Sequence, residues 1–242
     1  MAKYDIIGLD YANLRRPDPR IAAQIHAALG DAKTIVNVGA GAGGYEPPDR
    51  AVTAVEPSQT MIDQRPATAA PAIQGNAENL PFPDDSFDAA MASLTIHHWT
   101  DHAKGLQEMR RVSRGPVVLF TFDPTPRDFW LWHYFPGLAA LDAHIMPPMT
   151  FYESVLGPVD IHPIPIPADC TDGFLCAYWK RPAAYLDDKI RTGMSSFHAM
   201  DAVEAGLENL AHDLETGTWE QQNADLLNKN ALDMGYRLVI SR

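Results

Sequence analysis

Residues 34–46 read TIVNVGAGAGGYE, and this stretch decides how the chain folds. Its first five residues, 34–38, are mostly β-branched and apolar, which predicts a buried parallel strand. Three glycines follow at alternate positions, Gly39, Gly41 and Gly43. Because glycine has no Cβ and accepts backbone angles that other residues resist, a ligand can lie directly against the main chain of this loop.

A second predicted strand, at 51–55, leads directly into Glu56. A carboxylate at the end of this strand can accept hydrogen bonds from both hydroxyls of a ribose. Ligands of open α/β sheets bind beyond the carboxyl ends of the strands, so the loops after the first four predicted strands should converge on one crevice. The glycine loop and Glu56 together predict a pocket for a nucleoside-containing cofactor.

The glycine spacing alone fits two kinds of cofactor. Gly39, Gly41 and Gly44 also satisfy the dinucleotide pattern G-x-G-x-x-G, which is weak evidence when it stands alone. A dinucleotide needs a helix whose N-terminus faces its pyrophosphate, but Pro47 and Pro48 leave little room for a helix before the second strand. S-adenosylmethionine carries no phosphate and does not need that helix, so the sequence favours the methyl donor.

Two later segments carry a family resemblance. GNAENLPFPDDSFDAAMASLTIHHWTD at 75–101 and EMRRVSRGPVVLFTFD at 108–123 resemble class I methyltransferases of the UbiE-like, type 11 group. That group has an acidic residue near the adenine amino group where this chain has Asn76, whose carbonyl can still accept a hydrogen bond. The group also has an acidic residue two positions before the first glycine, where this chain has Asn37. The resemblance is clear over 1–123, and it implies S-adenosylmethionine as cofactor and S-adenosylhomocysteine as product.

The N-terminal segment extends the resemblance. Tyr4, Tyr11, Arg15 and Pro17 resemble the family's leading Y-D-x-x-A-x-x-Y-x-x-x-R element, with Gly8 in place of the usual alanine. An aromatic face can hold a sulfonium by cation–π attraction, and an arginine can take the methionine carboxylate in a two-pronged hydrogen bond. Packing of a leading helix by the two tyrosines is the alternative interpretation. The cofactor residues implied in this way are Tyr11, Arg15, Gly39, Ala40, Gly41, Gly43, Glu56, Pro57, Met61, Asn76, Ala77, Glu78, Ser93 and Leu94.

The loop after the fourth predicted strand carries His97 and His98, the candidate catalytic residues. In the family this loop borders both the cofactor and the acceptor. A histidine titrates near pH ~6.5 and suits a general base that removes the acceptor's proton. We slightly prefer His98, with His97 kept open and a packing role for the pair as the alternative. No carboxylate or thiol nearby completes a metal ligand set, so no metal is expected.

The alternation of strand and helix patterns predicts an α/β, doubly wound, Rossmann-like fold: a seven-stranded, mostly parallel sheet with helices on both faces and a helical insertion between the last two strands. The family resemblance implies that the last strand is antiparallel. We expect a single methyltransferase domain over 1–242, with an N-terminal helical cap at 1–30 and helical lid or insertion segments at 124–157 and 168–230. Strands are predicted at 34–38, 51–55, 71–75, 87–93, 116–122, 159–165 and 236–240, and helices at 19–29, 58–64 and 101–112, the last capped by Thr100 or Asp101.

Two aromatic clusters have open interpretations. The segment 129–135 is either a lid that lines the acceptor pocket or a buried helix. Tyr178 and Trp179 either contact the acceptor or pack a helix of the insertion.

Composition limits the possible partners. The net charge of −12 would repel a phosphate backbone, so no nucleic-acid partner is expected. No apolar run reaches the ~20 residues that span a bilayer, and the first ten residues lack a signal-peptide core, so we expect a cytoplasmic protein without a membrane partner. The two cysteines, Cys170 and Cys176, are expected to be free thiols.

These features predict transfer of a methyl group to an O, N or C atom of a small-molecule acceptor. Two alternatives stay open: an NAD-dependent oxidoreductase on the same sheet, and a noncatalytic S-adenosylmethionine-binding protein. The sequence does not identify the acceptor or the oligomeric state.

Overall fold

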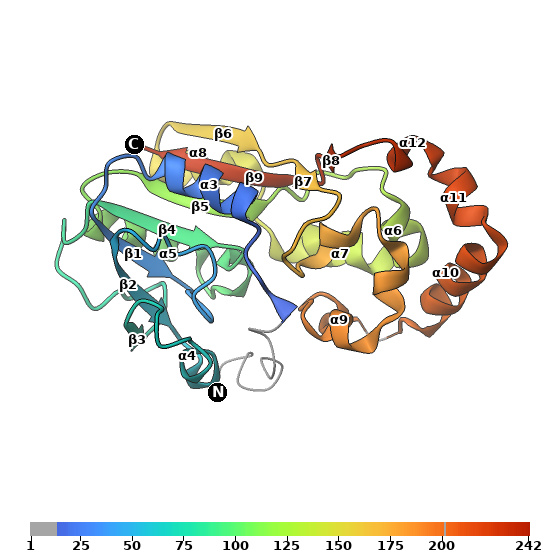
Figure 1. The fold of residues 1–242 in the computed structure, drawn as a ribbon. Coiled ribbons are helices and arrows are strands. Elements are labelled where there is room, and N and C mark those ends of the chain that lie inside the picture. The colour runs from blue at the N-terminus through green and yellow to red at the C-terminus, as the bar shows by residue number, and fades with distance from the viewer. Residues whose placement is uncertain (1–13, 201) are drawn as a thin grey trace.

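A seven-stranded sheet forms one half of the molecule in the computed structural model, which describes residues 14–200 and 202–242 (Figure 1). Its strand order is β3-β2-β1-β4-β5-β9-β6. The first five strands are parallel, whereas β9 runs antiparallel to both β5 and β6. This confirms the predicted mostly parallel sheet and its antiparallel last strand. The strands are β1 (Thr34–Val38), β2 (Ala51–Glu56), β3 (Ala72–Gln74), β4 (Ala89–Ser93), β5 (Val117–Phe122), β6 (Val159–Pro163) and β9 (Tyr236–Ser241).

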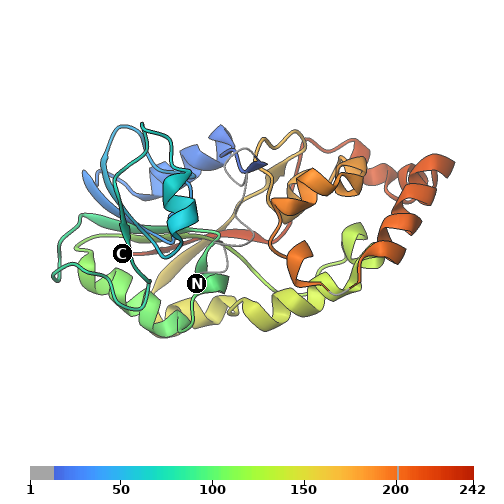
Figure 2. The same cartoon turned by 90° about the horizontal axis from the view of Figure 1, so that it is seen from below.

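Helices cover both faces of this sheet, as Figure 2 shows from below. Successive strand side chains point to opposite faces, so each central strand contributes to two cores. Ile35 belongs to the core that contains α3 (Pro19–Ala28), while Val36 belongs to the core that contains α5 (His102–Val112) and α8 (Met149–Leu156). The near-continuous apolar strands are therefore explained by burial on both sides.

Local capping fixes where two of these helices begin. Asp18 accepts a hydrogen bond from the Arg20 backbone N–H, and Pro19 occupies the first helical position of α3. Asp101 accepts one from the Lys104 backbone N–H at the start of α5, so of the two capping residues expected from the sequence, Thr100 and Asp101, the structure has Asp101.

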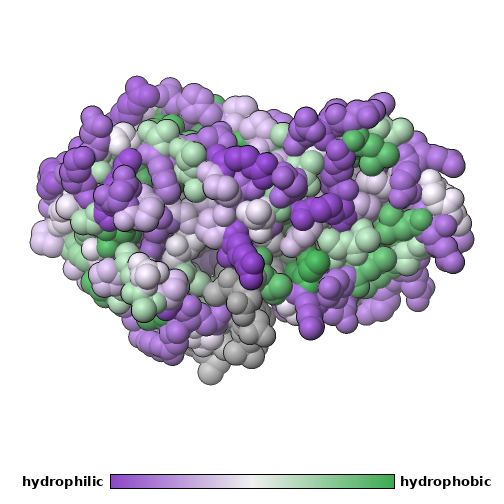
Figure 3. Space-filling model, in the orientation of Figure 1, coloured by the Kyte–Doolittle hydropathy of each residue, from purple (hydrophilic) through white to green (hydrophobic). Residues whose placement is uncertain are grey.

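The second half of the molecule is mainly helical (Figure 1). It contains two helices that follow β5 and the predicted insertion between β6 and β9. Hydrophilic residues cover most of the face seen in Figure 3, and hydrophobic residues gather mainly over this helical half. The remaining elements are α4 (Gln59–Asp63), η1 (Ile96–His98), α6 (Trp130–Tyr134), α7 (Pro136–Ile145), β7 (Ile166–Pro167), η2 (Leu175–Tyr178), η3 (Pro182–Leu186), α9 (Asp188–Thr192), η4 (Phe197–Ala199), α10 (Glu204–Thr216), α11 (Thr218–Gln222), α12 (Ala224–Leu227) and β8 (Ala231–Leu232).

Within residues 14–200 and 202–242, none of the helices combines the length and the apolar character that crossing a bilayer requires.

Candidate active site

A cavity of about 910 Å³ opens at the carboxyl ends of the parallel strands. The loops after β1, β2, β3 and β4 all contribute to its lining, as the position of the crevice in open α/β sheets predicts. Of the predicted cofactor residues, Tyr11 lies outside the described part of the chain and all the others line this cavity. Those that line it are Arg15, Gly39, Ala40, Gly41, Gly43, Glu56, Pro57, Met61, Asn76, Ala77, Glu78, Ser93 and Leu94.

The glycine loop is held tightly to the sheet. The backbone N–H groups of Gly39 and Ala40 both donate to the carbonyl oxygen of Val55, at 2.8 and 3.1 Å. Gly39 has φ +68°, and a Cβ at this position would overlap the Thr95 side chain. The whole of 39–50 is described and contains no helix, so the loop presents backbone without a helix N-terminus. This is the feature that made a pyrophosphate ligand unfavourable.

Glu56 is 5% exposed and its carboxylate is fixed by two backbone amides. Oε2 accepts from the Gly41 N–H at 2.8 Å, and Oε1 accepts from the Ser58 N–H at 2.9 Å. These two bonds fix the orientation of the carboxylate in the cavity lining. Its position at the end of β2 fits a ribose diol.

A buried ion pair beside the glycine loop was not found from the sequence. Arg65 Nη2 donates to both carboxylate oxygens of Glu46, at 2.7 and 2.8 Å, and Arg65 Nη1 donates to the Gly41 carbonyl at 3.0 Å. Asn37 Nδ2 donates to Glu46 Oε1 at 3.0 Å. Glu46 therefore supplies a carboxylate next to the motif position where the family's acid is replaced by Asn37.

Three polar atoms of residues that line the cavity are buried without a hydrogen-bond partner in the described chain: Asn37 Oδ1, Ser93 Oγ and Trp99 Nε1. A buried polar atom without a partner costs free energy, and such atoms in a native protein often mark a ligand site. Asn37 Oδ1 can only accept, so it suits a donor such as the amino group of a methionyl moiety. The lining thus fits S-adenosylmethionine at two points, Glu56 for the ribose and Asn37 for the amino group.

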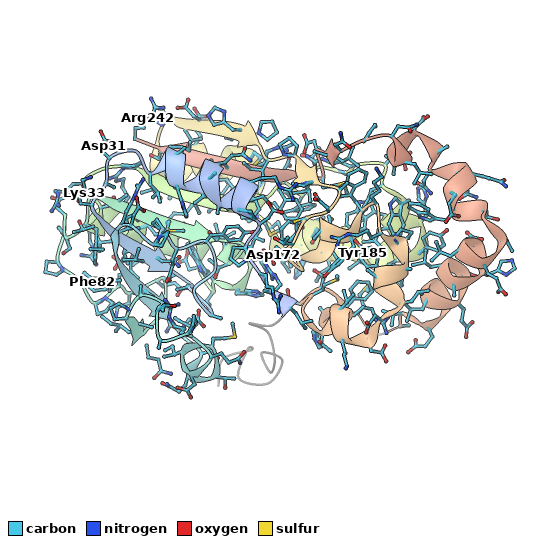
Figure 4. The ribbon with its side chains drawn as sticks, in the orientation of Figure 1. Asp31, Lys33, Phe82, Asp172, Tyr185 and Arg242 are labelled. Carbon is cyan, nitrogen blue, oxygen red and sulfur yellow. The ribbon has the colours of Figure 1, made fainter. Side chains whose placement is uncertain are left out.

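Asp172 links the insertion to the cavity. It is 2% exposed and accepts from Arg15 Nε at 2.6 Å and from the Tyr45 hydroxyl at 2.7 Å. Figure 4 shows Asp172 between the sheet half and the helical half. Burial and the neighbouring Asp172 charge raise the pKa of Tyr45 far above its ordinary value. The guanidinium of Arg15 lines the cavity as predicted, but it is already bonded to a carboxylate of the protein.

A second, smaller cavity of about 70 Å³ adjoins the first, and Arg15 and Leu94 line both. Leu94 has φ +52°, an unusual backbone angle for a residue other than glycine. Such strain often occurs at functional sites. The other lining residues are His97, Phe122, Asp142, Ile145, Met146, Phe174, Leu175, Gly193, Met194, Ser195, Ser196 and Tyr236.

The two candidate histidines face different cavities. Both lie in η1, with ring centroids 3.9 Å apart. His98 lines the large cavity, whereas His97 lines the small one. The choice of a base within this pair stays a prediction.

The aromatic clusters serve mainly packing. Phe129 and Trp130 are buried in the core, and among the described residues the segment 129–135 contributes to neither of the two adjoining cavities. Trp179 is fully buried and its Nε1 donates to the Ile166 carbonyl, so it does not line either cavity. The insertion instead reaches the small cavity through Phe174 and its neighbours.

The comparisons agree with this geometry. A family model described as a methyltransferase domain matches residues 36–120. The crystal structure of an Anabaena variabilis protein, provisionally described as a methyltransferase from an antibiotic biosynthesis pathway, is 35% identical, with a TM-score of 0.88 over 95% of this chain and 99% of that chain. Geranyl diphosphate C-methyltransferase from Streptomyces coelicolor A3(2), crystallised with S-adenosyl-L-homocysteine, shares the fold at 16% identity and a TM-score of 0.53, over 92% of this chain and 74% of that one.

Curated relatives match shorter segments. The rice (Oryza sativa) 2-methyl-6-phytyl-1,4-hydroquinone methyltransferase 2 is 33% identical over 36% of this chain and 28% of its own length. Demethylmenaquinone methyltransferase from Mycobacterium sp. (strain KMS) is 45% identical over 24% of this chain and 27% of its own length. The chain thus spans about a quarter of the length of these relatives.

Proposed function

The chain belongs to the class I S-adenosylmethionine-dependent methyltransferases, and from this premise we propose that it transfers a methyl group from S-adenosylmethionine to a small-molecule acceptor. The observation that carries the proposal is the pair of adjoining cavities that meet at Leu94. One is large, carries a carboxylate at the end of β2 and lacks a helix for a pyrophosphate. The other is small and mostly apolar, and it suits an acceptor.

Different residues of the large cavity contact different parts of the cofactor. Glu56 holds the ribose, and the segment 76–78 addresses the adenine. Asn37 Oδ1 accepts from the methionyl amino group, and Glu46 fixes the orientation of the Asn37 side chain by accepting from its Nδ2. The cofactor supplies an electrophilic methyl group on a sulfonium.

The protein's contribution to the reaction is positioning and proton removal. Methyl transfer is an in-line displacement, so rate depends on holding the acceptor atom behind the methyl carbon in a site that excludes water. The helical segments 124–157 and 168–230 act as the lid that closes the small cavity. A histidine of η1 removes the proton from the methyl acceptor. His97 lines the small cavity and His98 the large one, so separate substitution of each histidine shows which of them is the base.

The acceptor is not a nucleic acid, since the net charge of −12 opposes binding of a polyanion. We place the protein in the cytoplasm. Cys170 and Cys176 are both free and buried in the structure, as predicted, and free thiols are usual in reducing compartments.

Ligand binding tests the proposal first. Calorimetry with S-adenosylmethionine, S-adenosylhomocysteine and NAD is expected to show binding of the first two only. Preferential binding of NAD would favour an oxidoreductase and refute the proposal. A panel of small acceptors with radiolabelled methyl donor then measures turnover, and absence of transfer to every acceptor would favour a noncatalytic cofactor-binding protein.

The histidines are compared in the same assay. Loss of turnover in His97→Asn with unchanged S-adenosylhomocysteine affinity would identify the acceptor-side residue as the base. If His98→Asn alone loses turnover, the base lies on the cofactor side. Full activity of both variants would show that neither is needed.

A further inference from the structure

The small cavity contains an acidic side chain in an otherwise apolar position. Asp142 lies on α7, four residues after Leu138, so both lie on the same face of the helix. Leu138 is completely buried and Asp142 is 8% exposed. Aspartate is rarely buried without a partner, which makes this carboxyl a feature that needs a physical explanation.

No partner explains the burial. Within residues 14–200 and 202–242, the carboxyl of Asp142 takes part in no hydrogen bond or ion pair. Burial alone raises the pKa of Asp142 to about 7. Arg15, which lines the same cavity, is already bonded to the buried carboxylate of Asp172. A buried charge is normally paired, so the carboxylate calls for a cation from outside the protein.

The aromatic wall of the cavity suits the same cation. Phe122, Phe174 and Tyr236 all line it, and their rings form a continuous group. The Phe122 and Tyr236 ring centroids are 5.2 Å apart, and those of Phe174 and Tyr236 are 4.6 Å apart. The faces of aromatic rings carry partial negative charge and attract ammonium groups, most strongly in sites shielded from water.

We propose that the small cavity binds an ammonium group of the methyl acceptor, with Asp142 as its counter-ion and the rings of Phe122, Phe174 and Tyr236 as its walls. The assignment of this ligand to the acceptor rests on the proposed function, because it uses the junction with the large cavity at Leu94. The acceptor class is therefore an amine-bearing small molecule with an apolar body. A neutral hydroxyl would form a hydrogen bond with Asp142 but leave its buried negative charge uncompensated.

Two probes of nearly equal shape test the charge requirement. Benzylamine and benzyl alcohol are titrated calorimetrically at pH 8 into wild-type protein saturated with S-adenosylhomocysteine. Benzylamine is expected to bind at least tenfold more tightly than benzyl alcohol. Equal binding of the two, tighter binding of the alcohol, or binding of neither probe would overturn the proposal, and this comparison needs no mutant.

Asp142→Asn tests the residue, since asparagine keeps the shape and removes the charge. It is expected to lower benzylamine affinity at least tenfold and to leave benzyl alcohol affinity unchanged. Asp225→Asn, on the exposed surface of α12, makes the same charge change elsewhere and is expected to have no effect. Unchanged benzylamine affinity in Asp142→Asn would refute the assignment.

Cofactor binding is measured separately from amine binding. S-adenosylhomocysteine binding to wild-type protein and to both variants is measured in the same experiment. If S-adenosylhomocysteine does not bind, the proposed function fails, whereas benzylamine titrated in its absence still decides the ammonium site. If S-adenosylhomocysteine binds and benzylamine does not, the further inference alone is wrong.

Discussion

Replacing Asp142 by asparagine is expected to stabilise the protein at neutral and alkaline pH. The gain in the free energy of unfolding is expected to become smaller as the pH falls. Burial raises the pKa of this carboxyl from its ordinary value of 3.8 to about 7 in the folded state. A carboxyl whose pKa is raised on folding binds its proton more tightly in the folded than in the unfolded state. The free energy of unfolding therefore falls as the pH rises from about 4 to about 7, and it levels off above the folded-state pKa.

The size of the effect follows from the two pKa values. A tenfold change in proton affinity is worth about 1.4 kcal/mol. The difference between the ordinary pKa of 3.8 and the folded-state pKa of about 7 therefore corresponds to about 4 kcal/mol, as an upper limit. Asparagine has nearly the same shape and does not titrate. The variant should thus exceed the wild type by up to about 4 kcal/mol at pH 8 and by little at pH 4.

Urea unfolding of both proteins at intervals between pH 4 and pH 8 measures this difference. The other charged and titratable groups around the same carboxyl, His97, Arg15, Cys176 and Tyr236, occur in both proteins, so their contributions largely cancel in the comparison. The quantity to compare is the free energy of unfolding of Asp142→Asn minus that of the wild type. A difference that does not change with pH would refute the reasoning. A difference that is smaller at pH 8 than at pH 5 would also refute it.

Three further changes test the large cavity. Glu56→Gln is expected to weaken S-adenosylhomocysteine binding about tenfold or more in calorimetry, because hydrogen bonds to a charged group are worth about 1.5–3 kcal/mol, and unchanged affinity would exclude the ribose contact. Arg65→Met is expected to cost about 3–5 kcal/mol of stability in urea unfolding, because Glu46 is left buried without its cation; adding Glu46→Gln should recover part of the loss, and additive losses would contradict the pairing. Gly39→Ala is expected to lower the melting temperature and abolish cofactor binding through overlap with Thr95, and a variant that binds normally would show that the loop can shift.

Local sequence patterns predicted the sheet and most of the cavity lining because each signal lies within a few residues of its effect. The β-branched run at 34–38 formed β1 as expected, and Asp101 capped α5. The place of Glu56 in the cavity lining could be predicted from its position at the end of β2, because the carboxyl ends of parallel strands meet at one edge of the sheet. Tyr11 stays a prediction because it lies outside the described residues.

Partners that are distant along the chain could not be predicted in the same way. Asp172 is 157 residues from Arg15, and no periodicity connects the two. The unusual Asn37 indicated that a carboxylate was missing from the motif, but nothing indicated that Glu46 would replace it from the far side of the glycine loop. Asp142 reads in the sequence as an ordinary polar residue of a helix, and only the packed structure shows that it faces inward.

The pairing of Asp172 changes how the helical insertion should be understood. The insertion carries the carboxylate that neutralises Arg15 and accepts from Tyr45 at the end of the glycine loop. Arg15 is itself largely buried, with 15% of its side chain exposed, so loss of Asp172 would remove the carboxylate that is bonded to a buried cation. Removing the insertion would therefore disturb the cofactor cavity as well as the acceptor cavity. For this reason a deletion cannot separate a lid function from cofactor binding, whereas point changes on the acceptor side, such as those at Asp142 and His97, leave the Arg15–Asp172 pair in place.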